Sequence, residues 1–342
     1  MKKKIVFCIC LVLVTAVVLG FAQALVMPKY MSNAKEGALI AEYYNETSDH
    51  DVLFIGDCEV YESITPPTLW EEYGITSYIR GSAQQLAWQS YYLLEETLKY
   101  ETPKVVVFNV LALKYGEPQD EAYNRMTLDG MKLSATKLRA IRASMTEEES
   151  FFSYLFPLLR FHSRWKELSG EDVTYLFQRD TVSHNGYLMQ TEIRGGKSEI
   201  IPSPLADYTL PATSMEYLDR MRALCEEKGI RLVLMKAPTN DWKYHWYDEW
   251  DAQIVSYAEA HGLHYYNFIR TAEEIGIDWS TDTYDMGIHL NVFGAEKLTH
   301  CLGAILREQH GLESRKADPA VSEIWQKKTD AYYAERNAGK DY

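Results

Sequence analysis

The sequence lacks the features that mark several large classes of protein. Its 342 residues include 35 lysines and arginines against 49 aspartates and glutamates, which gives a net charge of −14. Nucleic acid is therefore not expected as a partner, because phosphate binding needs a basic surface. Only 5 cysteines occur, with neither a CxxC pair nor the spacing of metal ligands, so a disulfide scaffold or a cysteine-built metal domain is not indicated either.

Charge is absent from one long stretch near the start of the chain. After Lys2, Lys3 and Lys4, residues 5–27 contain no charged side chain. A helix of that length measures about 35 Å, which is enough to cross a bilayer. The preceding lysines favour a cytoplasmic amino terminus, so we expect the chain from about residue 28 onward to face outside.

Two other interpretations of this apolar stretch stay open. Ala22-Gln23-Ala24 resembles the small-residue cleavage site of a secretory signal, although the apolar region is longer than such signals usually have. A helix in the core of a soluble domain is the third possibility. We predict a single-pass anchor in the cell membrane with an extracytoplasmic domain, which becomes a secreted protein if the segment is cleaved.

The rest of the chain alternates between strand-like and helix-like segments. Short apolar runs predict buried strands at residues 51–56, 75–79, 104–110, 230–235 and 264–268. Continuous apolar strands separated by helices indicate an α/β fold, with a parallel sheet covered by helices on both faces. Ligands bind at the carboxyl ends of such strands, which directs attention to Asp57, Cys58, Gly81, Ser82 and Asn109.

We divide the chain into four parts. They are an anchor at 1–27, a linker at 28–49, the α/β domain at 50–310 and a C-terminal helical tail at 311–342. Residues 115–215 interrupt the strand–helix alternation, and we predict a largely helical insertion there. It either forms a lid or substrate wall, or it is a helical cap that completes the core.

One cysteine and one histidine stand where nucleophilic chemistry would need them. Cys58 follows the first predicted strand, and His289 lies near the carboxyl end, four residues after Asp285. Amides at a helix start stabilise a thiolate, a nearby histidine acts as the base, and a carboxylate fixes the tautomer of that histidine. Gly81 offers a backbone N–H and Asn109 a side-chain amide to a developing oxyanion.

The order and spacing of these residues resemble the motifs of the SGNH/GDSL hydrolase family, over about residues 50–115 and 228–308. The resemblance implies a flavodoxin-like three-layer sheet, a nucleophile at Cys58, oxyanion donors at Gly81 and Asn109, and an acid–base pair in Asp285 and His289. Two departures stand out. The position of the family's serine is occupied by cysteine, and the acid lies one residue further from the histidine than in the family pattern, with Asp282 as a reserve candidate.

The layout of an anchor followed by an outside domain narrows the resemblance. It is similar to that of bacterial cell-envelope proteins, including the D-alanyl-transfer proteins of teichoic-acid modification, which act beside membrane-bound O-acyltransferases. The resemblance implies a cell-envelope glycopolymer or acyl donor as ligand, and an O-acyltransferase of the membrane as a partner.

Other polar residues are weaker candidates for substrate contacts, and each also suits a surface or packing role. They are Asp57, Glu59, Ser82, His162, Arg164, His184 and Lys236. Glu59 is either a second acid beside the nucleophile or a solvated surface charge. Asp278, Asp282 and Asp285 cluster without the spacing of a calcium loop, so we expect no metal, and nothing in the sequence implies a cofactor.

Two functions follow from these residues. The first is an esterase or acyltransferase that acts on acyl groups, expected to be O-acetyl, of a cell-envelope polysaccharide through Cys58, His289 and Asp285. The second is a catalytically inactive accessory or binding subunit of a membrane-bound O-acyltransferase system, in which Cys58 packs as a small core residue. Catalysis predicts a cysteine sulfur within about 4 Å of a ring nitrogen of the histidine.

Overall fold

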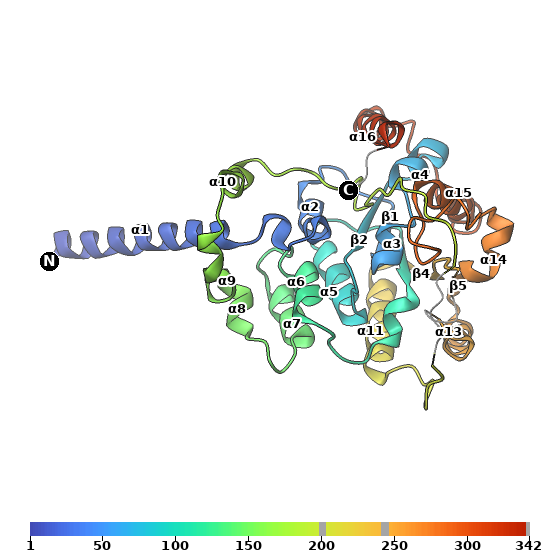
Figure 1. The fold of residues 1–342 in the computed structure, drawn as a ribbon, viewed down its shortest axis with the longest axis horizontal. Helices are drawn as coiled ribbons and strands as arrows, with labels where there is room; N and C mark the ends of the chain where they lie inside the picture. The colour runs from blue at the N-terminus through green and yellow to red at the C-terminus, as the bar shows by residue number, and fades with distance from the viewer. Residues whose placement is uncertain (198–202, 241–245, 340–342) are drawn as a thin grey trace.

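The computed structural model describes residues 1–197, 203–240 and 246–339. Its centre is a five-stranded sheet in the order β2-β1-β3-β4-β5, with every neighbouring pair parallel (Figure 1). The strands are β1 (Val52–Gly56), β2 (Ser77–Gly81), β3 (Val105–Asn109), β4 (Arg231–Lys236) and β5 (His264–Asn267). This is the flavodoxin-like strand order, so the α/β prediction is confirmed.

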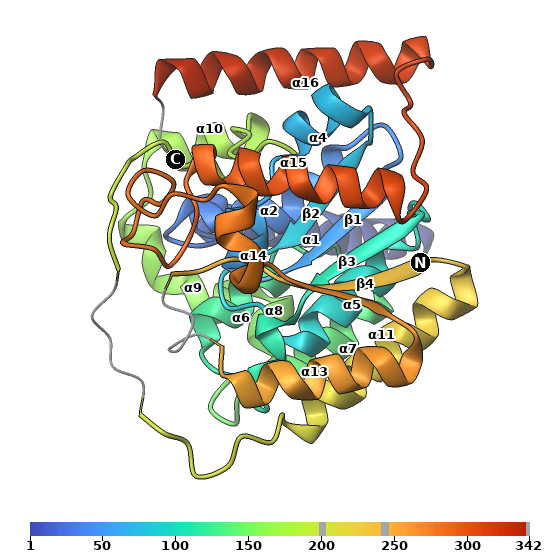
Figure 2. The ribbon, with the colours of Figure 1, turned by 90° about the vertical axis from the view of Figure 1, so that its right-hand side faces the viewer.

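Successive strand residues point to opposite faces of the sheet. Both faces therefore carry apolar side chains, and helices cover each of them. Phe54 and Val107 lie in the core of one face, whereas Ile55 and Phe108 lie in the core of the other. The first face carries α3 (Cys58–Tyr61), α4 (Pro66–Tyr73), α14 (Phe268–Ile275) and α15 (Val292–Glu308). The second face carries α5 (Ala87–Thr97), α11 (Ala212–Lys228) and α13 (Asp248–His261) (Figure 2).

The segments at the two ends of the domain pack against it. Residues 28–49, expected to form a linker, fold into the short helices η1 (Lys29–Met31), η2 (Lys35–Ala38), α2 (Leu39–Glu42) and η3 (Tyr43–Asn45). Leu39 and Ile40 are buried in the core, so these residues are part of the domain. Near the other end, α16 (Pro319–Ala338) covers α4, with the Trp70 and Trp325 rings stacked at a centroid distance of 5.6 Å.

The predicted insertion begins after η4 (Val110–Lys114), which follows β3. It contains α6 (Glu121–Leu128), α7 (Ala135–Ser144), α8 (Phe151–Leu155), α9 (Pro157–Phe161), η5 (His162–Lys166) and α10 (Gly170–Phe177). Leu128, Ile141 and Tyr154 form a core cluster with Leu93 of α5. Helices α6 to α8 therefore cap the core, as one of the two interpretations of this stretch proposed.

Later residues of the insertion cover the edge of the sheet beside β2. The Ile79 N–H of β2 donates to the carbonyl of Asn185 at 3.0 Å. The chain turns sharply at this contact, because Asn185 and Gly186 both have positive φ, of 57° and 85°. An edge strand that would otherwise present unpaired backbone groups is thereby covered.

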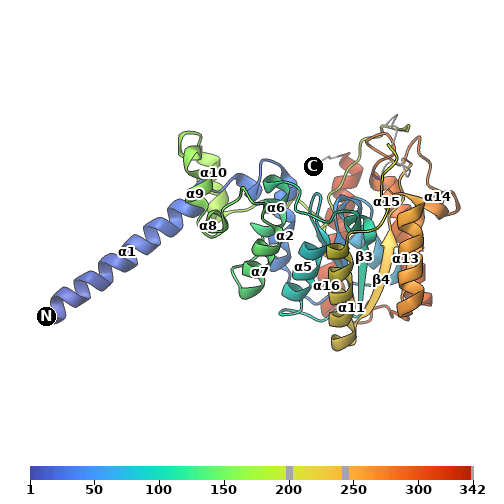
Figure 3. The same ribbon diagram turned by 90° about the horizontal axis from the view of Figure 1, so that it is seen from below.

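The apolar amino-terminal stretch forms α1 (Lys2–Val26), which projects away from the domain (Figures 1 and 3). Among the described residues, α1 is the one helix that is long and apolar enough to cross a membrane. The side of the membrane on which the domain lies stays a prediction from the lysines.

A Gly186→Ala substitution tests the covered edge. The new Cβ would lie 2.2 Å from the carbonyl oxygen of Ile79. Together with the positive φ, this clash is expected to lower the free energy of unfolding by about 1–3 kcal/mol, measured by urea unfolding of the full chain in detergent. In the control, Gly170→Ala, the Cβ meets nothing within 4 Å, and a change below about 1 kcal/mol is expected. Equal effects of the two substitutions would contradict the packing.

Candidate active site

The turn from β1 into α3 places Cys58 at the carboxyl edge of the sheet. Asp57 caps the short helix, its carboxylate accepting from the Glu59 N–H at 3.2 Å, and Cys58 is the first helical residue. Gly56 ends the strand, and a Cβ there would lie 2.5 Å from Val60 and 2.9 Å from the Cβ of Asn109. Only a residue without a side chain allows β3 to approach the turn so closely.

The fold brings Cys58 and His289 together. The Cys58 Sγ lies 3.1 Å from Nε2 of His289, and the other ring nitrogen, Nδ1, lies 2.6 Å from Oδ2 of Asp285. The His289 side chain is 18% exposed, so the arrangement is reachable from solvent. When the ring is neutral, a carboxylate at Nδ1 holds the hydrogen on that nitrogen and leaves the Nε2 lone pair directed at the thiol.

A compact turn explains how Asp285 reaches His289 across the extra residue. Its Oδ1 accepts from the backbone N–H groups of Ile288 at 3.1 Å and His289 at 2.8 Å. Between them, Met286 and Gly287 take positive φ, of 67° and 94°. Left-handed backbone tightens the turn, which brings the carboxylate back onto the ring. The reserve candidate, Asp282, instead pairs with Lys297 at 2.6 Å.

The histidine loop is braced by the insertion and by the start of α15. The backbone N–H of Arg194 donates to the Thr283 carbonyl, and the Arg194 carbonyl accepts from Met286, both at 2.9 Å. Asn291 caps α15 through Phe293 at 3.1 Å, and its amide nitrogen donates to the Thr281 carbonyl at 2.8 Å. The final stretch of the insertion thus positions the loop that carries His289.

A second carboxylate, which the sequence interpretation missed, faces the same histidine. Glu62 Oε2 lies 3.5 Å from Nδ1 of His289 and accepts from the Tyr284 hydroxyl at 2.9 Å. Burial raises the pKa of Glu62 to about 7. Burial also lowers the pKa of His289, but the charge of Glu62 and the hydrogen bond to Asp285 outweigh it and leave that pKa well above its usual value. The position of Glu62, one helical turn after Cys58, is the sequence signal that would have found it.

Two effects at Cys58 oppose the thiolate that is expected from the sequence. Burial at the edge of the sheet raises the pKa of Cys58 to about 11, and the neighbouring His289 offsets only part of this. Helix α3 is a single turn of 4 residues, so its amides supply little favourable potential. A raised thiol pKa makes a neighbouring base necessary for attack by Cys58.

The amide of Asn109 is engaged with two carboxylates. Its Nδ2 donates to Oδ1 of Asp57 at 3.1 Å and to Oε2 of Glu59 at 2.9 Å, and its Oδ1 accepts from the Ala237 N–H at 3.1 Å. Both amide hydrogens are thus directed at carboxylates. Burial, followed by the charge of Glu59, raises the pKa of Asp57 to about 6.

Glu59 and Lys236 form a buried ion pair beneath the candidate site. The Lys236 Nζ lies 2.7 Å and 2.8 Å from the two carboxylate oxygens, and it also donates to the Ala237 carbonyl at 2.9 Å. Their side chains are 4% and 0% exposed, so the expectation that Glu59 is a solvated surface charge is wrong. This geometry gives Lys236 a charge partner inside the protein.

The remaining predicted residues fall into two groups. Gly81 stands in register with Gly56 at the same edge of the sheet, and the buried Ser82 beside it donates to Gln85 at 3.2 Å. His162, Arg164 and His184 are not brought to Cys58 by any contact described here. Arg164 binds the Val26 carbonyl at 2.8 Å, and His184 pairs with Glu335 of α16 at 2.9 Å. His162 is an exposed residue of η5.

Lys114 is a further charged residue that the sequence interpretation missed. It ends η4 directly after β3, on the edge that carries Cys58. Burial lowers the pKa of Lys114, and the negative charges of Glu59 and Asp57 offset part of this effect. Its position a few residues beyond a strand end is a weak signal in sequence, because lysine is common at such turns.

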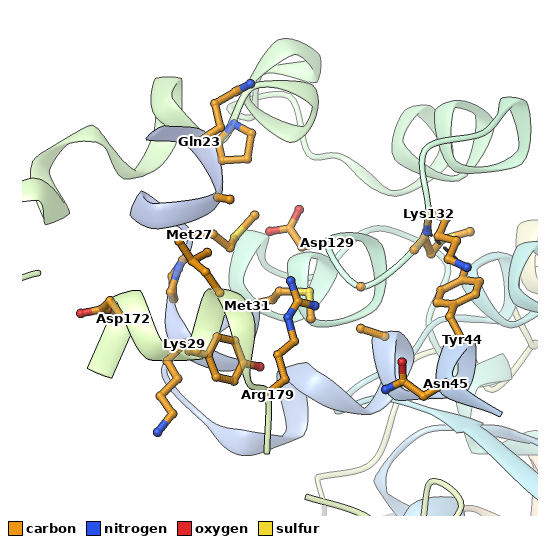
Figure 4. Close-up of a pocket in the computed structure, with 18 residues that line it drawn as sticks. Gln23, Met27, Lys29, Met31, Tyr44, Asn45, Asp129, Lys132, Asp172 and Arg179 are labelled. Carbon is orange, nitrogen blue, oxygen red and sulfur yellow. Dashed lines mark hydrogen bonds between the residues drawn. The ribbon is translucent and has the colours of Figure 1, made fainter. Parts of the chain in front are cut away.

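A pocket of about 430 Å³ lies apart from this site, at the base of α1 (Figure 4). Its lining includes Met27, Tyr44, Asp129, Lys132 and Arg179, and no member of the Cys–His–Asp arrangement. Within the described part of the chain, no group of three or more histidine, cysteine or acidic side chains is arranged to hold a metal ion.

Comparison with known proteins gives limited help. No family model and no curated protein matches the chain. Among solved structures, it is similar to a Bacteroides fragilis protein assigned as an acylhydrolase, with a TM-score of 0.38, 12% identity, and coverage of 79% of this chain and 94% of the other. A GDSL-like lipase from Bacteroides thetaiotaomicron gives a TM-score of 0.39 and 12% identity, with coverage of 81% of this chain and 98% of the other. These values are too low to carry an argument about activity, so the geometry must do so.

Lys236→Met tests whether the buried pair is structural. Removing the lysine leaves the Glu59 charge buried, and we expect the free energy of unfolding to fall by about 3–5 kcal/mol. The double variant Glu59→Gln/Lys236→Met should recover at least half of this loss in urea unfolding. As a control, Lys327→Met breaks an ion pair whose side chains are 74% and 72% exposed, and it should cost below about 1 kcal/mol. Single and double variants of equal stability would contradict the structural role.

Proposed function

We propose that this protein is a membrane-anchored, extracytoplasmic SGNH-like esterase or acyltransferase. Its substrates are acyl groups, O-acetyl foremost, on a cell-envelope polysaccharide. One observation carries the proposal: the chain of contacts from Cys58 Sγ through His289 to Asp285, at 3.1 Å and 2.6 Å. Nucleophile, base and orienting acid are within hydrogen-bond reach at the carboxyl edge of a parallel sheet, where such folds bind ligands.

The first half of the reaction forms a thioester. Nε2 of His289 takes the thiol proton as Cys58 Sγ attacks the ester carbonyl, which gives a tetrahedral oxyanion. Collapse of this species breaks the bond to the sugar oxygen, and His289 returns the proton to that oxygen as the alcohol leaves. Asp285 stabilises the imidazolium that forms during both steps.

The second half transfers or releases the acyl group. His289 removes a proton from water, which leads to hydrolysis, or from another sugar hydroxyl, which leads to transfer. The resulting nucleophile attacks the thioester, the C–S bond breaks, and the proton returns to Cys58. A thioester retains high acyl-transfer potential, so a thiol nucleophile suits an enzyme that passes the group to a new acceptor.

The oxyanion would meet donors from three neighbouring strand ends. These are the backbone amides of Cys58 and Gly81 and the side-chain amide of Asn109. To serve, Asn109 must exchange one of its carboxylate partners for the substrate oxygen. Lys114, which ends η4 just after β3, would add positive charge at the same edge. Each well-placed donor is worth about 2.7–4 kcal/mol of transition-state stabilisation.

A second candidate function is an accessory or binding subunit of a membrane-bound O-acyltransferase. Two observations favour it. The Asn109 amide is already engaged by Asp57 and Glu59, and burial raises the pKa of the thiol to about 11. In that role the domain would hold a glycopolymer or an acyl carrier beside its partner without reacting.

Substitution of Cys58 separates the two functions. With p-nitrophenyl acetate and the full chain in detergent, we expect Cys58→Ala to lower kcat/KM by roughly 10³-fold or more, because the residual rate comes from binding and oxyanion donors alone. The kcat/KM of Cys58→Ser should lie between the values for wild type and Cys58→Ala. The control is Cys301→Ala, a half-buried free cysteine outside the site. Equal rates for wild type, Cys58→Ala and Cys58→Ser would exclude the nucleophile and favour the accessory subunit.

Glu62→Gln tests the second carboxylate as a positioning residue. His289 must be unprotonated to act as the base, so kcat/KM should rise as the pH passes through its pKa. The Glu62 charge raises that pKa, and its removal should move the rising limb of the pH profile to lower pH. Glu117→Gln removes an exposed charge and should leave the profile in place. A rising limb that does not move in Glu62→Gln would disprove this coupling.

A further inference from the structure

The helices next to α1 expose an unusual amount of apolar surface. We define the collar as residues 151–177, which contain α8, α9, η5 and α10. Its most exposed apolar side chains are Phe152 at 61%, Phe156 at 47%, Leu159 at 59%, Trp165 at 65%, Val173 at 44% and Phe177 at 79%. Such a concentration on a water-facing surface marks a binding surface for protein or membrane.

The collar is attached to the end of α1. Helices α9, α10 and η5 contact α1, and the three segments surround its base in Figures 1 and 3. Arg164 of η5 donates to the carbonyl of Val26, in the last turn of α1, at 2.8 Å and pairs with Asp172 of α10 at 3.0 Å. These bonds fix the height of the collar relative to the point where α1 ends.

Charge distinguishes the collar from the rest of the domain. Residues 151–177 carry three basic and three acidic side chains, whereas the chain as a whole has 35 against 49. A neutral surface with aromatic side chains and arginines can approach lipid headgroups that would repel the acidic remainder. Tryptophan and other aromatics concentrate at the boundary between hydrocarbon and water for the same reason.

The length of α1 places the collar at that boundary. Its 25 residues measure roughly 37 Å, and the hydrocarbon core of a bilayer is about 30 Å thick. If Lys2, Lys3 and Lys4 remain at one surface, the turn that ends at Val26 reaches the opposite headgroup layer. The side chains held beside that turn are therefore at lipid level.

We infer that the collar is a lipid-binding surface that lies in the outer headgroup layer around α1, with Trp165, Phe156 and Phe177 inserted among the lipids. The inference rests on the proposed membrane anchoring and adds to it. A single helix lets an attached domain swivel, but a collar embedded beside it fixes how the domain stands on the membrane. The Cys58 site is then presented at a constant height above the lipid.

Fluorescence quenching by brominated phosphatidylcholine tests this inference on the full chain in liposomes. The 8 tryptophans do not include any residue of α1. Trp70, Trp88, Trp246, Trp250 and Trp325 are buried in the domain, whereas Trp165 is 65% exposed, and the half-buried Trp279 lies outside the collar. Trp165 should therefore supply most of the quenched signal. We expect bromines near the headgroup to quench wild type clearly and Trp165→Phe at least twofold less, with both proteins floating with the liposomes on a density gradient.

The possible results separate the inference from the proposals on which it rests. Protein that floats but shows no quenching, or the same quenching in both forms, overturns the collar and points to a protein partner on this surface instead. Protein that does not float overturns the anchor and the collar together. Activity toward p-nitrophenyl acetate is measured on the same samples, so failure of the catalytic proposal is seen independently of either outcome.

Discussion

The parallel alignment of five strands is the constraint on which this structure depends. Because the strands run in one direction, the ends of β1, β2, β3 and β4 meet at a single edge, and each contributes polar groups there. Burial at that edge then governs the chemistry. It raises the pKa of Cys58, Glu62 and Asp57 together, so that the carboxylates beneath the thiol need cations and amides as partners.

Two networks share this edge and have different tasks. Below the thiol, the Lys236 ammonium neutralises the Glu59 carboxylate and Asn109 donates to it, which joins β3 and β4 to the start of α3. Beside it, the loop ending at His289 is held by its own tight turn and by the insertion. The first network is buried, whereas the second is partly open to solvent. That division suits the acyl transfer proposed above, since a positioned base must face a substrate entering from outside.

The surface beside α1 differs in composition from the rest of the molecule. There the exposed side chains are apolar and the local charge is balanced, in contrast to the acidic surface elsewhere. A helix able to cross a bilayer and a neutral aromatic collar at its base form one continuous surface. Arg164, first considered as a substrate contact, belongs to this surface, because its guanidinium satisfies a carbonyl at the end of α1 that the helix cannot satisfy itself.

The sequence by itself determined the strands, the class of fold and the apolar helix, because these follow from local patterns of hydrophobicity. It also pointed to Cys58, His289 and Asp285, since residues after strand ends and before a helix cap carry a local signal. Only the tertiary structure decided what surrounds them. Glu62, Tyr284 and Lys114, the engaged amide of Asn109 and the burial of Glu59 with Lys236 depend on contacts between distant segments. The protonation of a group depends on the charges and solvent that those contacts bring or remove, and no local pattern encodes them.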